Sequence, residues 1–170
     1  DVIKKIPLNL ADKVEILVIN DGSTDKTVEK AKQAGADYII NSNKNHGVGY
    51  AFFLGINEAL KKNPDIIVNI DADGQFDPSD IEKLIEPILK NQADMVTASR
   101  FIDKSLTPEM PFMKKIGNIM FSRLVSRLSG EKFFDTQCGF RAYSREACLH
   151  MNLFGKYTYT QEVFIDLISK

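Results

Sequence analysis

The chain has 170 residues, 44% apolar and 26% charged, which is typical of a soluble globular domain with a core rather than of a disordered chain. A formal net charge of -1 gives no reason to expect nucleic acid as a partner, and no apolar run approaches the ~20 residues that a membrane helix needs. Two cysteines, Cys138 and Cys148, are too few for a disulfide framework and favour reduced thiols.

Strand and helix patterns alternate along the chain, which predicts a single α/β domain over residues 1–170. The elements are expected to form a mostly parallel sheet flanked by helices. Strands are predicted at 14–19, 38–40, 65–70, 94–98 and 140–143. Helices are predicted at 25–34, 48–62, from 78, at 111–128 and 160–169, with a short helix capped by Ser144 and the tail of a helix within 1–10.

The turn after the first strand and the loop before the second long helix are both polar. The turn runs from Asn20 to Asp25 and offers Ser, Thr and Asp as caps for the next helix. In the loop, Gly47 and Gly49 begin a glycine pattern, but Phe52 stands where the third glycine of a dinucleotide fingerprint would be. There is no Walker A sequence either. The sequence therefore predicts a nucleotide-type sheet without NAD-type or ATPase-type loops.

The third predicted strand ends in a cluster of oxygen-bearing side chains. If the chain stays extended, Asp71, Asp73 and Gln75 lie on one side of it. They would converge at the carboxyl end of a strand, where open α/β sheets bind their ligands. Hard oxygen ligands suit Mg²⁺ or Mn²⁺ better than zinc or copper. The alternative is an ordinary turn, in which Asp and Gly are also favoured.

Five sequence elements, in this order, carry a family resemblance. They are Asn20-Asp21-Gly22-Ser23-Thr24-Asp25, the loop from Asn43 to Ala51, Asp71-Ala72-Asp73-Gly74-Gln75 with Pro78, Ser99-Arg100, and Cys138-Gly139-Phe140-Arg141. The chain resembles family 2 glycosyltransferases of the GT-A fold, and among them dolichyl- and polyprenyl-phosphate sugar synthases. The resemblance covers residues 14–143, and it implies a GT-A type nucleotide-diphospho-sugar transferase fold.

For the donor, the resemblance implies a pocket lined by the first turn and the following loop. The family usually has two acidic residues in this turn, and Asn20 replaces the first of them, which leaves the preference between uridine and guanosine open. Alternatively, the turn is a plain connection and the loop a mobile one. The nucleotide-binding residues implied are Asn20, Asp21, Gly22, Ser23, Asn45, Gly47, Asp71 and Ala72.

The resemblance also implies the metal site and the course of the reaction. Asp71, Asp73 and Gln75 match the family's metal site, with Asp71 nearer the ribose and diphosphate. Mg²⁺ or Mn²⁺ bound there would neutralise the leaving nucleoside diphosphate as a Lewis acid. Family members invert the anomeric centre in a single displacement, and Asp73 would be catalytic through the ion.

For the acceptor, the resemblance implies Arg100 and Arg141, since a guanidinium binds phosphate through two hydrogen bonds. Either arginine could instead form a structural salt bridge. The basic and apolar segment at residues 112–115 could meet an anionic lipid head, or it could be an ordinary start of a helix.

The need for a general base depends on the acceptor. A phosphate acceptor is already ionised, whereas a sugar hydroxyl needs a carboxylate to take its proton. Asp135 and Glu162 are the candidates, and both also suit a structural or acceptor-binding role. His46 is interpreted as a loop contact and His150 as structural.

The prediction is a metal-dependent, inverting glycosyltransferase that moves a sugar from a GDP- or UDP-sugar to a polyprenyl or dolichyl phosphate. It would act at the cytoplasmic face of a membrane and associate with the membrane surface. Transfer to a saccharide hydroxyl in polysaccharide or glycolipid synthesis is one alternative, and a non-catalytic transferase-like scaffold is another. A response-regulator or phosphatase domain is disfavoured, because the strand ending at Asn20 lacks the phosphatase Asp-x-Asp pattern.

One departure from the family concerns the start of the chain. Family members begin with a strand that forms the first wall of the nucleotide pocket, and no such pattern precedes the first predicted strand here. We therefore expect a fragment that lacks its first strand and is shortened at its carboxyl end as well. A missing first strand would leave an exposed sheet edge and an incomplete pocket.

Overall fold

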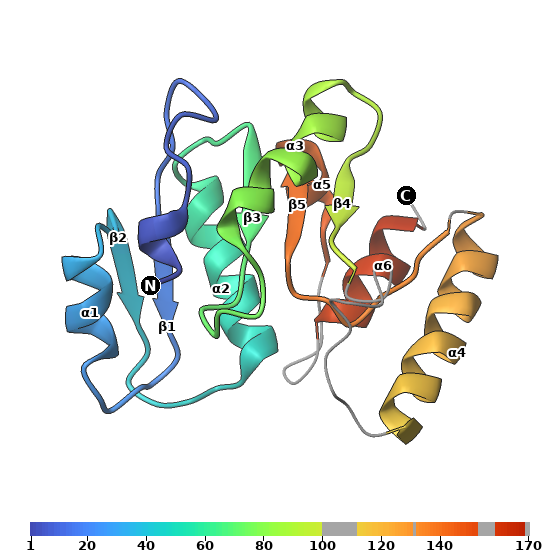
Figure 1. Ribbon diagram of the computed structural model, residues 1–170, viewed down its shortest axis with the longest axis horizontal. Coiled ribbons are helices and arrows are strands. Elements are labelled where there is room, and N and C mark those ends of the chain that lie inside the picture. Colours follow the sequence, from blue (N-terminus) through green and yellow to red (C-terminus); the bar gives the residue numbers. More distant parts are fainter. Residues whose placement is uncertain (100–111, 131, 153–158, 169–170) are drawn as a thin grey trace.

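The computed structural model describes residues 1–99, 112–130, 132–152 and 159–168. Its strands are β1 (Leu17–Asn20), β2 (Tyr38–Asn41), β3 (Ile66–Asn69), β4 (Met95–Thr97) and β5 (Arg141–Ser144). Its helices are α1 (Thr27–Gln33), α2 (Val48–Leu60), α3 (Ile81–Leu89), α4 (Phe112–Ser129), α5 (Arg145–His150) and α6 (Thr160–Ile168), with 3-10 turns η1 (Ile3–Lys5) and η2 (Pro78–Asp80). Figure 1 shows their arrangement.

Each predicted strand and helix has a counterpart close to its expected position, and only the first segment differs. A single 3-10 turn stands where the tail of a helix was expected. The turn ends at Lys5 because Ile6 is extended, with ψ 122°, and proline at position 7 disfavours a helical conformation in the residue before it. The predicted cap of α5 is confirmed, since Ser144 Oγ accepts a hydrogen bond from the main-chain N–H of Ala147 at 3.0 Å.

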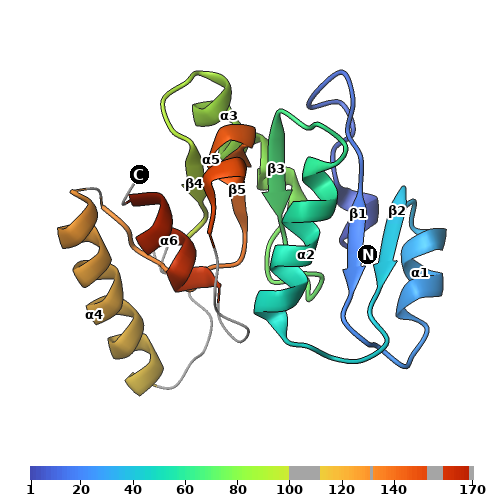
Figure 2. The ribbon, with the colours of Figure 1, turned by 180° about the vertical axis from the view of Figure 1, so that it is seen from behind.

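Within the described residues the strands form two hydrogen-bonded sheets, the pair β1-β2 and the three-stranded sheet β3-β5-β4. β1 and β2 are parallel, as predicted. β5 lies between β3 and β4 and runs antiparallel to both, so that β3 and β4 share a direction. Figure 2 shows β3 pointing the same way as β1 and β2. The alternation of strands and helices predicted the parallel strands, whereas the reversed β5 follows α4 and a loop, and local pattern alone does not set its direction.

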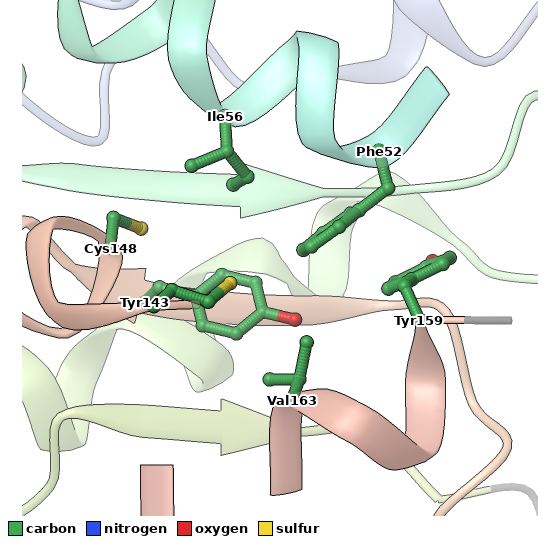
Figure 3. Packing of buried hydrophobic residues seen from close by; sticks show 7 residues of the cluster. Phe52, Ile56, Tyr143, Cys148, Tyr159 and Val163 are labelled. Carbon is green, nitrogen blue, oxygen red and sulfur yellow. The ribbon is translucent and has the colours of Figure 1, made fainter. Parts of the chain in front are cut away.

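Hydrophobic clusters cover both faces of the three-stranded part of the sheet, because successive side chains of β5 point to opposite faces. Ala142 faces α3, whose apolar side chains are buried except for the terminal Leu89. Tyr143 faces the other side, where Phe52 of α2 stacks on Tyr159 with ring centroids 3.9 Å apart (Figure 3). This second cluster comprises Phe52, Ile56, Tyr143, Cys148, Met151, Tyr159 and Val163.

Both cysteines are buried and neither forms a disulfide, which agrees with the reduced thiols expected. Burial raises the pKa of the Cys148 thiol to about 12, so it stays protonated and unreactive near neutral pH. Among the residues that the structure describes, no helix has both the length and the apolar character needed to cross a bilayer.

Candidate functional site

The candidate site lies at the edge of the sheet where the parallel strands end. The arrowheads of β1, β2 and β3 point to this edge, and α2 begins there (Figure 2). The predicted donor residues follow β1 at 21–23, and the predicted metal ligands follow β3 at 71–75. The fold thus places both segments at the carboxyl ends of strands, as the sequence predicted.

Asp21 connects the turn after β1 to the loop before α2. Its two carboxylate oxygens each accept a hydrogen bond from the main-chain N–H of His46 at 3.0 Å, and Oδ2 accepts another from Gly47 at 2.8 Å. The His46 ring stacks on Tyr50, and its Nδ1 lies 3.4 Å from Asp21 Oδ1. Asp21 therefore fixes the start of α2, and its contact with a nucleotide stays a prediction.

The neighbours of Asp21 bring the same two segments close together. Gly22 has φ +82°, and a Cβ there would lie 2.5 Å from the main-chain nitrogen of Asn45, so only glycine fits. Asn20 is buried; its Nδ2 donates to Asn41 Oδ1 at 3.1 Å, and its Oδ1 accepts from the Ser23 N–H at 3.1 Å. The structure thus assembles this part of the predicted set: Asn20, Asp21, Gly22, Ser23, Asn45 and Gly47.

The predicted metal ligands Asp71, Asp73 and Gln75 have exposed side chains in the loop between β3 and η2, as does Ala72 beside them. Asp73 Oδ1 accepts a hydrogen bond from the Gln75 N–H at 2.9 Å, which closes a tight turn around Gly74. Within the described part of the chain, no three His, Cys, Asp or Glu side chains lie close enough together to hold a metal ion by themselves. Two carboxylates and an amide oxygen nevertheless fit Mg²⁺ or Mn²⁺, which often share their remaining positions with substrate oxygens and water.

Asp71 lies against a second segment of chain, which leads into β5. A Cβ on Gly139 would lie 2.4 Å from Asp71 Oδ2, so a side chain there would displace the Asp71 carboxylate. Gly139 is held in place because Asn69 Nδ2 donates to its carbonyl oxygen at 2.6 Å and to Tyr159 Oη at 3.2 Å. Burial, and secondarily the negative charge of Asp71, raises the pKa of Tyr159, so its hydroxyl stays protonated near neutral pH.

Arg141 is fully buried at the start of β5. Its Nε donates to the Cys138 carbonyl at 2.8 Å and its Nη2 to the Thr136 carbonyl at 2.9 Å. Its Nη1 and the Tyr143 hydroxyl have no hydrogen-bond partner among the described residues. Burial raises the pKa of Tyr143 to about 12, although the positive charge of Arg141 acts in the opposite direction. In this geometry the guanidinium organises residues 136–138, and phosphate binding by Arg141 stays a prediction.

We expect Arg141→Lys to lower the free energy of unfolding by about 2–4 kcal/mol, because each hydrogen bond to a charged group contributes ~1.5–3 kcal/mol and an ammonium cannot reproduce the planar fork. The exposed Arg123→Lys on α4 is the matched control and should change stability by less than about 0.5 kcal/mol. Urea denaturation measures both variants. Equal stability of the two would contradict the organising role of Arg141.

The remaining candidates for acceptor chemistry differ in accessibility. Asp135 is fully buried, and its Oδ1 accepts hydrogen bonds from Asn118 Nδ2 at 3.0 Å and from the Gln137 N–H at 3.1 Å. Glu162 is half-buried on α6. Arg100 lies outside the described residues, as do the side chains of residues 112–115.

Three residues that sequence reasoning did not single out support the site. Asn69 follows an apolar run, and Asn118 lies on the inward side of α4. Gly139 precedes Phe140 and Arg141 in a motif whose arginine alone was given a predicted role. A polar residue at the end of a buried strand was the available signal for Asn69. The close approach of Gly139 to Asp71 joins segments far apart in the sequence and left no local signal.

Comparisons with known proteins give a family match and several relatives. The family model described as Glycosyl transferase family 2 matches residues 2–151. An uncharacterized protein of Methanocaldococcus jannaschii is 42% identical over 132 residues, which cover 78% of this chain and 54% of that protein. The UDP-N-acetylglucosamine–dolichyl-phosphate N-acetylglucosaminyltransferase of Methanococcus voltae is 33% identical over 148 residues, covering 78% and 59%. The chain thus spans little more than half the length of these curated relatives.

Among solved structures, the fold is similar to glucosyl-3-phosphoglycerate synthase of Mycobacterium tuberculosis, crystallised with Mn²⁺, UDP-glucose and phosphoglyceric acid. The TM-score is 0.63 at 23% identity, and the match covers 86% of this chain and 51% of that one. This similarity supports the predicted fold class.

Proposed function

The chain belongs to glycosyl transferase family 2, and from this membership we propose that the protein transfers a sugar from a nucleoside-diphosphate sugar to a polyprenyl or dolichyl phosphate. The observation that carries the proposal is the pair of exposed carboxylates, Asp71 and Asp73, at the carboxyl end of β3, with Gly139 packed against the first of them. The dolichyl-phosphate acceptor named for the Methanococcus voltae relative supports the same substrate class.

The donor would be bound between the two loops at the sheet edge. Asn20 and the loop held by Asp21 would contact the nucleotide, and the exposed side of the 71–75 loop would meet the diphosphate. Asp71, Asp73 and Gln75 would hold Mg²⁺ or Mn²⁺. The bound ion would supply Lewis-acid stabilisation of the leaving diphosphate, and the fold relative crystallised with Mn²⁺ and UDP-glucose supports this assignment.

A phosphate acceptor suits this site because it needs no proton-accepting carboxylate. Asp135 is buried and its Oδ1 accepts two hydrogen bonds, which supports a structural role for it over that of a base. Transfer to a saccharide hydroxyl is the second candidate, and the half-buried Glu162 is the observation that favours it. The membrane-surface and cytoplasmic location expected from the resemblance belongs to the same proposal.

The test is a thermal-unfolding titration with UDP and GDP, with and without Mg²⁺ or Mn²⁺, followed by transfer assays. Binding to the folded state raises stability by about 2.7 kcal/mol at a hundred times the Kd. We expect a metal-dependent rise in Tm with one nucleotide, and transfer from its sugar conjugate to a short-chain polyprenyl phosphate. A rise accompanied by transfer only to saccharides would favour the second candidate. No rise with either nucleotide would favour a non-catalytic scaffold.

A further inference from the structure

Asn69 is the last residue of β3 and stands two positions before the predicted metal ligand Asp71. The alternation of side chains continues past the end of β3, because Val68 and Ile70 both pack against the hydrophobic cluster on the α3 side. Asn69 and, by the same alternation, Asp71 therefore belong to the opposite side of the chain. The predicted ligand thus has an amide side chain as its neighbour on that side.

The side-chain amide of Asn69 binds two distant segments at once. Its Nδ2 donates to the Gly139 carbonyl oxygen at 2.6 Å and to Tyr159 Oη at 3.2 Å. Gly139 belongs to the segment before β5, and Tyr159 directly precedes α6. A side-chain amide has two N–H donors, so these two bonds use both of them and fix the orientation of the group.

The bond to Gly139 holds the surface against which Asp71 lies. A Cβ at position 139 would be 2.4 Å from Asp71 Oδ2 and 3.3 Å from its Oδ1, so both carboxylate oxygens lie close to this glycine. Arg141 holds two earlier carbonyl groups of the same segment, at 2.8 Å and 2.9 Å. The carbonyl of Gly139 itself is held by Asn69, which makes this bond the most direct link between β3 and the surface beside Asp71.

The bond to Tyr159 anchors the other hydrogen of the Asn69 amide to a packed residue. Tyr159 is buried, and its ring stacks on Phe52 with centroids 3.9 Å apart (Figure 3). Its main-chain carbonyl also accepts a hydrogen bond from the Val163 N–H at 3.0 Å, at the start of α6. Because the hydroxyl is attached to a packed ring, the amide that binds it cannot easily rotate away from Gly139.

We propose that Asn69 is a positioning residue, which fixes the Asp71 carboxylate through Gly139 and thereby sets the affinity of the site for a divalent ion. Groups that orient metal ligands by hydrogen bonding typically change metal affinity by about 10–100-fold when they are replaced. The inference rests on the proposed function, in which Asp71 is a ligand of the ion. It extends that function, because Asn69 acts through Gly139 and needs no contact with the ion.

The first measurement is a titration with Mn²⁺, alone and with UDP or GDP, in which electron paramagnetic resonance reports the free ion. Asn69→Leu keeps a similar side-chain size and removes both donated hydrogens, so it should raise the Kd for Mn²⁺ by about tenfold or more. Tyr159→Phe removes one bond and keeps the bond to Gly139, so it should raise the Kd far less. Phe52→Leu is the matched control, because it disturbs the packing around Tyr159 without removing either hydrogen bond.

Hydrogen exchange measures the same role without metal or nucleotide. Asn69→Leu should raise the exchange rates of the amides at 136–139 by about tenfold or more, since local opening follows the loss of local hydrogen bonds. Phe52→Leu should instead raise exchange in α2 and α6, whose residues pack around the replaced ring. Circular dichroism and Tm establish that each variant is folded.

The outcomes separate this inference from the proposed function. Equal Mn²⁺ affinity of the Asn69→Leu and Phe52→Leu proteins would overturn the positioning role and leave the proposed function standing. Absence of Mn²⁺ binding by the wild type would count against the metal site of the proposed function, and hydrogen exchange would then decide the role of Asn69. Wild-type exchange rates at 136–139 in Asn69→Leu would overturn that role, and a rise confined to this segment would support it.

Discussion

Asp73→Asn should lower sugar transfer by about a thousandfold while leaving the fold intact. A divalent ion contributes several kcal/mol to transition-state stabilisation, and ~4 kcal/mol corresponds to a factor of about a thousand in rate. The substitution removes one carboxylate of the proposed metal site from an exposed loop. It keeps an oxygen that can accept the hydrogen bond from the Gln75 N–H, now 2.9 Å from Asp73 Oδ1. Activity at saturating Mn²⁺ and a direct metal titration are the measurements.

Asp77→Asn is the matched control for this substitution. Asp77 is exposed in the same segment, and its Oδ1 accepts a hydrogen bond from the Ser79 N–H at 3.1 Å in a similar turn. The control should keep activity within about twofold, since a surface substitution of this kind changes stability by less than about 0.5 kcal/mol. An Asp73→Asn protein whose transfer rate and metal affinity match those of the control would remove Asp73 from the metal site.

Gly139→Ala should weaken metal-dependent donor binding by about a hundredfold, the order of effect that a misplacement of about 1 Å can have at a site. It should lower stability by less than about 1 kcal/mol, because the group that must shift is the end of an exposed side chain. The new Cβ would lie 2.4 Å from Asp71 Oδ2 and 3.1 Å from its Cγ. Gly139 cannot easily retreat, because its carbonyl accepts from Asn69 and the preceding carbonyl, that of Cys138, accepts from Arg141. The carboxylate of Asp71 must therefore move. Calorimetric titration with nucleotide and Mn²⁺ measures the change.

Two comparisons isolate this clash from a general effect of alanine. Gly117→Ala on α4 meets no atom within 4 Å, so it should be neutral or stabilise the protein by up to ~1 kcal/mol through helix propensity. Combining Gly139→Ala with Asp71→Ala removes the group that the new methyl displaces, so the stability costs should not add. Strict additivity in this double-mutant cycle would mean that Gly139 acts independently of Asp71.

The candidate site at the carboxyl ends of the strands shows how much of the structure local sequence patterns predict. The apolar run before Asp71 predicted a strand. For the Asp-Ala-Asp-Gly sequence the expectation was an extended chain, with a turn as the alternative, and the structure has the turn that Asp73 closes with Gln75. The apolar periodicity of α3 and the cap at Ser144 are likewise present in the sequence, because each depends on residues within one or two helical turns. Parallel pairing of β1 and β2 followed from the helix between them.

Arg141 and Asp135 show where local pattern stops being sufficient. Both are charged residues in a polar, glycine-bearing segment. The sequence favoured acceptor contact for the arginine and left a base, an acceptor-binding and a structural role open for the aspartate, whereas the fold buries both side chains completely. Their burial depends on partners supplied by folding, the carbonyls of Thr136 and Cys138 for the arginine and Asn118 of α4 for the aspartate. Hydrogen-bond partners for a buried charge are supplied only by the packed structure.

The sequence by itself determined the order of strands and helices and the cluster of oxygen-bearing side chains after β3, since these arise from side-chain periodicity and backbone preference over a few residues. Only the tertiary structure decided the reversed direction of β5, the contact of Gly139 with Asp71 and the hydrogen bonds of Asn69 to two distant segments. Each of these depends on groups that meet across long separations in the chain. Packing and the pairing of buried polar groups select among arrangements that look the same locally.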